Sequence, residues 1–129
     1  MIAENKIKPD CKILLAEGDR FLSKVISNKL LRRGFCLSLA NDGLEAMAKI
    51  KTEQFDLVLL DLTLSKKNGL EVLAELKKDK KLKIKIVVLL SLSKTSDIEK
   101  IKKLGITDYI IKSDLSINTL ADKVGELIK

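Results

Sequence analysis

The sequence contains no histidine, no tryptophan, a single proline and only two cysteines. Without histidine the commonest general base of enzymes is missing, so any acid–base chemistry would rest on Asp, Glu or Lys. Cys11 and Cys36 do not form a Cys-x-x-Cys pair and have no histidine to complete a metal site, and we interpret both as reduced structural thiols. A thiolate or imidazole metal centre is therefore not expected.

Aromatic residues make up 3% of the chain, and arginine is almost absent although the formal net charge is +7. Of the 25 basic residues only Arg20, Arg32 and Arg33 are arginines, and a lysine-rich run over residues 77–85 has the pattern of a solvated turn. Arginine forks and aromatic rings supply much of the phosphate contact and base stacking of nucleic-acid-binding proteins. We therefore interpret the lysines as solubilising and expect no nucleic-acid partner.

Long hydrophobic runs are also missing. No run approaches the roughly 20 apolar residues that span a bilayer, and the first residues lack the apolar segment of a secretory signal. We therefore expect a cytoplasmic protein with no membrane partner. A chain of 129 residues with 46% hydrophobic and 33% charged residues is typical of one globular domain. Residues 1–10 are interpreted as a polar lead-in and residues 11–129 as the domain.

Strand and helix patterns alternate along this domain. Short apolar runs predict strands at residues 12–16, 36–40, 57–61, 84–90 and 108–111. The residues that recur at helical spacing after each strand are Phe21, Val25, Ile26, Leu30 and Leu31; Leu44, Met47, Ala48 and Ile50; Leu70, Val72, Leu73 and Leu76; Ile98, Ile101 and Leu104; and Leu120, Val124, Leu127 and Ile128. The last helix is expected over residues 115–128, with Ser116 as its cap. Five strand–helix units predict an α/β fold, a doubly wound five-stranded parallel sheet with helices on both faces.

Polar side chains stand where these strands end. Asp61 closes the third strand, and alone it is equally compatible with capping a turn. The other strand ends carry Glu17 and Asp19, Ser91, and Lys112. In open α/β sheets, ligands bind at the carboxyl ends of the strands. We therefore expect carboxylates, a hydroxyl and an ammonium group to converge on one site.

In this order the residues resemble the receiver domains of two-component response regulators, over about residues 11–129. The segments 56–62 (Asp-Leu-Val-Leu-Leu-Asp-Leu) and 68–73 (Asn-Gly-Leu-Glu-Val-Leu) are similar to the most recognisable block of that family. The resemblance implies the (βα)5 flavodoxin-like receiver fold. It also implies Asp61 as the phosphoacceptor, Lys112 as the partner of the phosphate, and Ser91 and Tyr109 as the switch residues.

The resemblance further implies a magnesium ion, because phosphoryl transfer needs its charge neutralised and magnesium prefers oxygen ligands. Glu17, Asp61 and the backbone carbonyl of Thr63 would be the ligands. Glycine, as Gly18, stands where the family has a second acid, so we expect weakened magnesium binding. Asp19 is the candidate replacement, although its expected place is the start of the following helix.

Three more positions depart from the family pattern. Ser65 and Ser113 stand where the family usually has proline. No cis peptide bond is expected before Ser113, because a non-proline cis bond costs roughly 2.5–4 kcal/mol. Leu92 is bulkier than the small residue usual after the switch serine and would restrict access to the acceptor. We therefore expect weak phosphorylation.

The first hypothesis is a single-domain response regulator, phosphorylated on Asp61 by a histidine kinase or phosphotransfer protein. It would act as a monomer or weak homodimer, presenting a downstream partner protein with a switched face on the last two helices and last strand. The alternative is a degenerate receiver that binds partners without phosphate, which Gly18 supports. In neither case is the chain a conventional enzyme; at most it would catalyse magnesium-dependent phosphorylation and dephosphorylation of itself.

Two other classes fit the sequence less well. A dehalogenase-type phosphatase needs a second aspartate two residues after its nucleophile, where this chain has Thr63. A flavin-binding flavodoxin needs a neutral, donor-rich phosphate loop after the first strand. Glu17 and Asp19 would repel that phosphate, so both classes are set aside.

Overall fold

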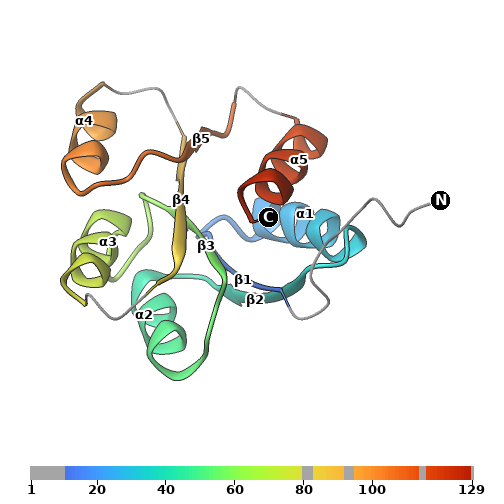
Figure 1. Cartoon of the computed structure of the whole chain (residues 1–129), viewed down its shortest axis with the longest axis horizontal. Helices are drawn as coiled ribbons and strands as arrows, with labels where there is room; N and C mark the ends of the chain where they lie inside the picture. Colours follow the sequence, from blue (N-terminus) through green and yellow to red (C-terminus); the bar gives the residue numbers. More distant parts are fainter. Residues whose placement is uncertain (1–10, 80–82, 92–94, 114–115, 129) are drawn as a thin grey trace.

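The computed structural model describes residues 11–79, 83–91, 95–113 and 116–128, in which strands and helices alternate from end to end (Figure 1). The elements are β1 (Lys12–Ala16), α1 (Arg20–Arg32), β2 (Cys36–Ala40), α2 (Gly43–Thr52), β3 (Leu57–Asp61), α3 (Gly69–Lys78), β4 (Lys85–Leu90), α4 (Thr95–Lys103), β5 (Tyr109–Ile111) and α5 (Ile117–Leu127). The strand predictions agree with these bounds to within one residue. The predicted lead-in (residues 1–10) and the predicted start of the last helix at Leu115 lie outside the described residues.

The strands form one parallel sheet in the order β2-β1-β3-β4-β5, which confirms the predicted doubly wound fold. The register pairs Ala16 of β1 with Leu60 of β3, and the next residues along these strands are Glu17 and Asp61. At the other side of the sheet, the backbone N–H of Lys112 donates to the carbonyl of Leu90 at 2.8 Å. The register therefore delivers the ends of β1, β3 and β5 to the same edge.

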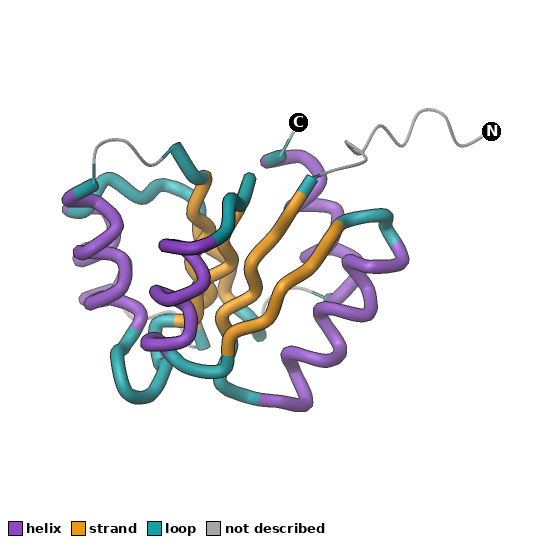
Figure 2. Tube along the Cα trace, turned by 90° about the horizontal axis from the view of Figure 1, so that it is seen from below, coloured by secondary structure: helices purple, strands orange, loops and turns teal. Residues whose placement is uncertain are grey.

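Helices cover both faces of the sheet (Figure 2). One core cluster lies under α2, α3 and α4, and the other lies under α1 and α5. Each of the five residues of β3 is buried, as expected for a central parallel strand whose two faces are both covered. Among the described residues, no helix combines the length and the apolar character needed to cross a bilayer.

Not all of the apolar residues at helical spacing lie on buried faces. Phe21 and Leu31 of α1 are 79% and 53% exposed, and Leu44 of α2 is 57% exposed. The buried residues are Ser23, Ile26, Ser27 and Leu30 in α1, and Gly43, Ala46, Met47 and Ile50 in α2. Both sets follow the i, i+3, i+4, i+7 spacing of one helix face, and the exposed apolar residues lie off it.

Within the described residues, side-chain caps begin α1, α2, α3 and α5. Asp19, Asp42 and Ser116 each accept a hydrogen bond from a backbone N–H in the first turn of α1, α2 and α5, and the cap expected at Ser116 is confirmed. Asn68 caps α3 in a reciprocal arrangement with Glu71. Because helices start near the carboxyl ends of the strands, these caps lie on the same side of the molecule as the polar strand ends.

The start of α3 lies directly against the end of β3. The N–H of Gly69 donates to the carbonyl of Leu62 at 3.0 Å. A Cβ atom at Gly69 would stand 2.5 Å from the Cα of Leu62 and would overlap the backbone oxygen of Asp61. Glycine is therefore required here by close backbone approach, and it fixes the loop that follows Asp61.

We expect Gly69→Ala to lower the free energy of unfolding by about 1–3 kcal/mol, because backbone atoms must move to admit the methyl group. Gly125→Ala in α5 is the matched control. A Cβ atom at Gly125 meets nothing within 4 Å, so alanine there should raise stability by about 0.5–1 kcal/mol through its helix propensity. Urea unfolding curves check both values, and equal midpoints for Gly69→Ala and the wild type would contradict the close approach.

Candidate functional site

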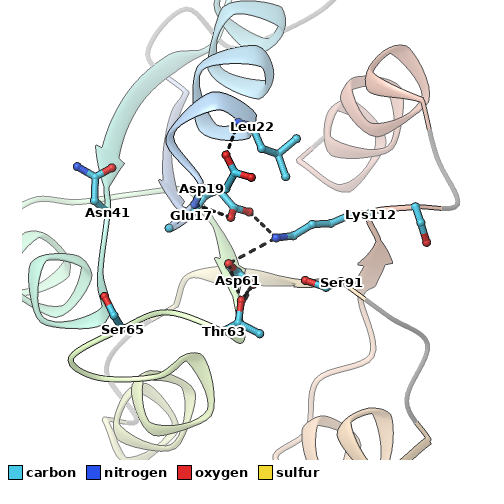
Figure 3. Close-up of a pocket in the computed structure, with 11 residues that line it drawn as sticks. Glu17, Asp19, Leu22, Asn41, Asp61, Thr63, Ser65, Ser91 and Lys112 are labelled. Atoms are coloured by element: carbon cyan, nitrogen blue, oxygen red, sulfur yellow. Dashed lines mark hydrogen bonds and ion pairs between the residues drawn. The ribbon is translucent and has the colours of Figure 1, made fainter.

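A pocket of about 720 Å³ opens at the edge where β1, β3 and β5 end (Figure 3). Its lining residues are Glu17, Gly18, Asp19, Leu22, Asn41, Asp61, Thr63, Ser65, Ser91, Lys112 and Ser113. They come from strand ends, the loops that follow them and the first turn of α1, which are far apart in sequence. The sheet thus brings together the carboxylates, hydroxyl and ammonium that the strand ends predicted.

The ammonium group of Lys112 lies between two buried carboxylates. Its Nζ is 2.7 Å from Oε1 of Glu17 and 3.4 Å from Oδ2 of Asp61. Glu17 is 1% exposed and Asp61 is 2% exposed. One positive charge therefore faces two negative charges in a poorly solvated place, so the three groups carry a net negative charge when all are ionised. Such a site favours a further cation or the protonation of one acid.

Burial raises the pKa of the Glu17 carboxyl, and the nearby Asp61 carboxylate acts in the same direction. Lys112 and the backbone N–H of Asp19, which donates to Oε2 of Glu17 at 3.1 Å, lower that pKa in part. Oε1 of Glu17 contacts Lys112 without the directional geometry of a hydrogen bond. Burial outweighs the attraction to Lys112, so the pKa of Glu17 is raised on balance.

Thr63 holds the carboxylate of Asp61 from the loop after β3. Its backbone N–H donates to Oδ1 at 3.1 Å. Its hydroxyl lies 3.0 Å from Oδ1 and 3.1 Å from Oδ2, so one hydroxyl reaches both oxygens. Only the backbone carbonyl of Thr63 was expected in the site, and the contact of its hydroxyl with Asp61 was missed. A hydroxyl two residues after a carboxylate was the available signal, because short side chains often bond across such a turn.

Asp19 lies at the rim of the pocket but acts as the N-cap of α1. Its Oδ1 accepts a hydrogen bond from the N–H of Leu22 at 3.1 Å. Among the described residues, no hydrogen bond or ion pair joins its carboxylate to Asp61 or Lys112. The helix start expected for Asp19 is therefore confirmed, and a role in replacing the acid missing at Gly18 would require it to leave this cap.

The two predicted switch residues differ in position. Ser91 lines the pocket, and its side chain points toward Asp61 without a hydrogen bond to any described residue (Figure 3). Tyr109 is half-buried and packs against the core under α2, α3 and α4, outside the pocket lining. Leu92, which was predicted to restrict access to the acceptor, lies outside the described residues.

The oxygen donors of the pocket are compatible with a hard divalent cation that takes only a few of its ligands from the protein. Within the described parts of the chain, no cluster of three or more His, Cys, Asp or Glu side chains could hold a metal by itself. Two buried carboxylates remain, with Oε1 of Glu17 lacking a directed hydrogen bond. Magnesium is commonly held by one or two carboxylates plus waters and phosphate oxygens, so the residues present fit that ion.

Residues 13–124 match the response regulator receiver domain. The chain belongs to this family. Receiver domains are signalling domains of two-component systems that act with kinases or phosphotransfer proteins, and phosphorylation and magnesium are typical of them.

Several relatives share this receiver domain. The probable transcriptional regulator ycf29 of Pyropia yezoensis is 39% identical over 102 residues, which cover 78% of this chain and 46% of that protein. The solved structure of the phosphorylated cyanobacterial phytochrome response regulator RcpA is 34% identical, with a TM-score of 0.79 and coverage of 92% of this chain and 91% of that one. The Mn²⁺-bound form of response regulator Rcp1 is 32% identical, with a TM-score of 0.77 and 91% coverage of each chain. This receiver domain spans less than half the length of the transcriptional regulators it matches first.

We expect Glu17→Gln to raise the free energy of unfolding of the metal-free receiver domain at neutral pH. The pKa of Glu17 is raised above its ordinary value of 4.5, so the cost of ionising it is absent below about pH 4.5. That cost grows as pH rises through the folded-state pKa and is fully present above it. The variant's advantage, measured by urea unfolding with a chelator present, should therefore disappear at acid pH.

Glu75 offers a control of opposite sign. Its pKa is lowered, first by a hydrogen bond from Lys67, so Glu75→Gln should lose stability at neutral pH relative to acid pH. A Glu17→Gln protein that is less stable than the wild type at neutral pH would show that the contact with Lys112 outweighs burial.

Proposed function

We propose that this receiver domain accepts a phosphoryl group on Asp61 from the phosphohistidine of a histidine kinase or phosphotransfer protein. The observation that carries the proposal is the contact of Asp61 with Lys112 in an open pocket at the carboxyl edge of the sheet. A buried carboxylate at the end of a rigid strand is held in place for attack, and a lysine beside it can pair with the incoming phosphate.

In the transfer step an oxygen of Asp61 forms a bond to phosphorus while the bond from phosphorus to the donor nitrogen breaks. The electron pair of that bond leaves with the donor imidazole. Lys112 then moves from its two carboxylates toward the phosphate oxygens, to which it donates hydrogen bonds. Ser91, whose hydroxyl points toward Asp61 and has no described partner, donates a further hydrogen bond.

Glu17, Asp61 and the backbone carbonyl of Thr63 would hold magnesium in this site. When bound, the ion neutralises charge on the transferring phosphoryl group. The net negative charge of the Glu17, Asp61 and Lys112 cluster supports this assignment. The absence of an acid at Gly18 leaves fewer anionic ligands, which supports weak rather than tight binding.

The output is proposed to be a protein-binding face on α4, β5 and α5. Ser91 lies between β4 and α4, and Tyr109 lies on β5 next to the core under α4. A shift of the serine toward a phosphate would open space for the tyrosine ring to move inward, which is a bistable packing change of the kind used in switches. The proposal takes residues 11–129 as a single-domain regulator, in line with coverage of 91% of the RcpA and Rcp1 chains. It further places the protein in the cytoplasm, acting through a partner protein rather than on nucleic acid.

A second candidate is a receiver domain that binds its partner without phosphate. It is favoured by the Glu17–Lys112 ion pair, which neutralises part of the site from within the chain. Gly18 also favours it, because the family's second acid is missing. Phosphorylation of the wild type separates the two candidates.

Incubation with magnesium and acetyl phosphate is expected to add one phosphoryl group to the wild type and none to Asp61→Asn. The amide keeps the shape of the side chain but has no anionic oxygen to attack phosphorus. Intact-mass analysis measures the gain. Omission of magnesium is the control for the ion, and an unmodified wild type at high magnesium would leave the phosphate-independent candidate.

Gly18→Asp is expected to tighten magnesium binding by about tenfold, because it adds a carboxylate to the donor set. The site has room for it, since a Cβ atom at Gly18 meets only the backbone oxygen of Asn41, at 3.7 Å, and the backbone needs no left-handed conformation. Calorimetric titration with magnesium checks the affinity. Gly125→Asp adds the same charge outside the pocket and should leave the affinity unchanged; equal affinity of Gly18→Asp and wild type would contradict the predicted weakening.

A further inference from the structure

The hydroxyl of Thr63 contacts the Asp61 carboxylate, which is the group that reacts in the proposed function. It contacts both carboxylate oxygens of Asp61, at 3.0 and 3.1 Å, from the same loop (Figure 3). Oδ1 also accepts the backbone N–H of Thr63, and Oδ2 also contacts Lys112. Both oxygens therefore have partners, and among the described residues the hydroxyl is the one group within hydrogen-bond distance of both.

The contact with the Thr63 hydroxyl lowers the reactivity of the Asp61 carboxylate, whichever of its oxygens attacks phosphorus. A hydrogen bond to a carboxylate stabilises its negative charge, and that charge is spent as the new bond to phosphorus forms. The hydroxyl has one proton and lies within hydrogen-bond distance of both oxygens, so it can donate to either, and a bond to either oxygen stabilises the charge that the two share. The contact is stronger in the resting state than in the transition state, so it raises the barrier rather than lowering it.

The fold does not depend on the hydroxyl. Thr63 is exposed, and among the described residues its hydroxyl bonds to Asp61 alone. A rotation about χ1 can release the carboxylate without moving the backbone. The backbone N–H of Thr63 would continue to hold Oδ1 after that release.

We propose that Thr63 is a positioning residue whose hydroxyl hydrogen-bonds the Asp61 carboxylate in the resting receiver domain and slows phosphorylation until it rotates away. This inference rests on the proposed function, because it concerns the rate of transfer to Asp61. The bonds that change are those of the proposed transfer: the Asp61 oxygen–phosphorus bond forms, the bond between phosphorus and the donor breaks, and the leaving group takes the electron pair. The threonine proton is not transferred.

Thr63→Val and Thr63→Ser form a matched pair. Valine keeps the shape of threonine and the backbone N–H but removes the hydroxyl, whereas serine keeps the hydroxyl and loses the methyl group. With acetyl phosphate and magnesium fixed, the valine variant should be phosphorylated about two- to tenfold faster than the wild type, the range expected for one net hydrogen bond. The serine variant should react at the wild-type rate, and both should unfold at the wild-type temperature.

A second measurement needs neither phosphate nor metal. The ¹³C resonance of the Asp61 carboxylate, assigned by its loss in Asp61→Asn, reports the hydrogen bonds that this group accepts. In metal-free protein it should shift in Thr63→Val and stay near the wild-type position in Thr63→Ser. A structural role of the methyl group alone would give the opposite pattern.

The outcomes separate the two proposals. A faster valine variant with a shifted carboxylate resonance, and a serine variant like the wild type in both, supports the role of the hydroxyl. A phosphorylated wild type with an equally fast or slower valine variant overturns that role while leaving the phosphoacceptor function intact. No phosphorylation of any of the three proteins overturns the proposed function, and with it the control of its rate.

Discussion

The position of the Lys112 ammonium group between the Glu17 and Asp61 carboxylates is the interaction on which the site depends. Two carboxylates buried side by side repel each other and lose hydration, and a single cation 2.7 and 3.4 Å away offsets part of that cost. The fold supplies the arrangement through the register of β1 with β3 and the position of β5 at the far side of β4. Close contact of Gly69 with the backbone after Asp61 then fixes the acceptor's loop.

Much of this arrangement could be predicted from the sequence, because it follows from chain order. Asp61 and Lys112 stand directly after apolar runs, and parallel strands joined by helices must place their ends at one edge. What the order could not show is which polar groups bond. The Thr63 hydroxyl contacts both oxygens of Asp61 through local side-chain rotation, which strand patterns do not encode.

The exposed Phe21 shows a second limit of the sequence, because it was one of the apolar residues used to recognise α1. Two of the four buried positions in that helix are serines, and the apolar residues counted at its start and end lie off that face. Periodicity identified the helix correctly because Ile26 and Leu30 are spaced correctly, whereas its exact orientation depends on packing against α5 and the sheet. The same packing leaves Asp19 at the helix start, where capping is worth about 1 kcal/mol and competes with any role in the pocket.

In the resting site, both carboxylate oxygens of Asp61 already have partners within the chain, in Thr63 and Lys112. This bears on the effect of the missing acid at Gly18. Two of the groups that contact the Asp61 carboxylate can move: the ammonium of Lys112 can turn to a phosphate, and the hydroxyl of Thr63 can rotate to solvent, while the backbone N–H of Thr63 stays in place. A site with glycine at position 18 has less negative charge to attract a cation. The Asp61 carboxylate then interacts mainly with Thr63 and Lys112 of its own chain. Under the proposed function, the free energy needed to break those contacts would be part of the barrier to phosphorylation, whereas an acid at position 18 would favour binding of the ion. Under the proposed function, the absence of an acid at Gly18 and the contact of the Thr63 hydroxyl would act in the same direction, toward a receiver domain that is held in its unphosphorylated state.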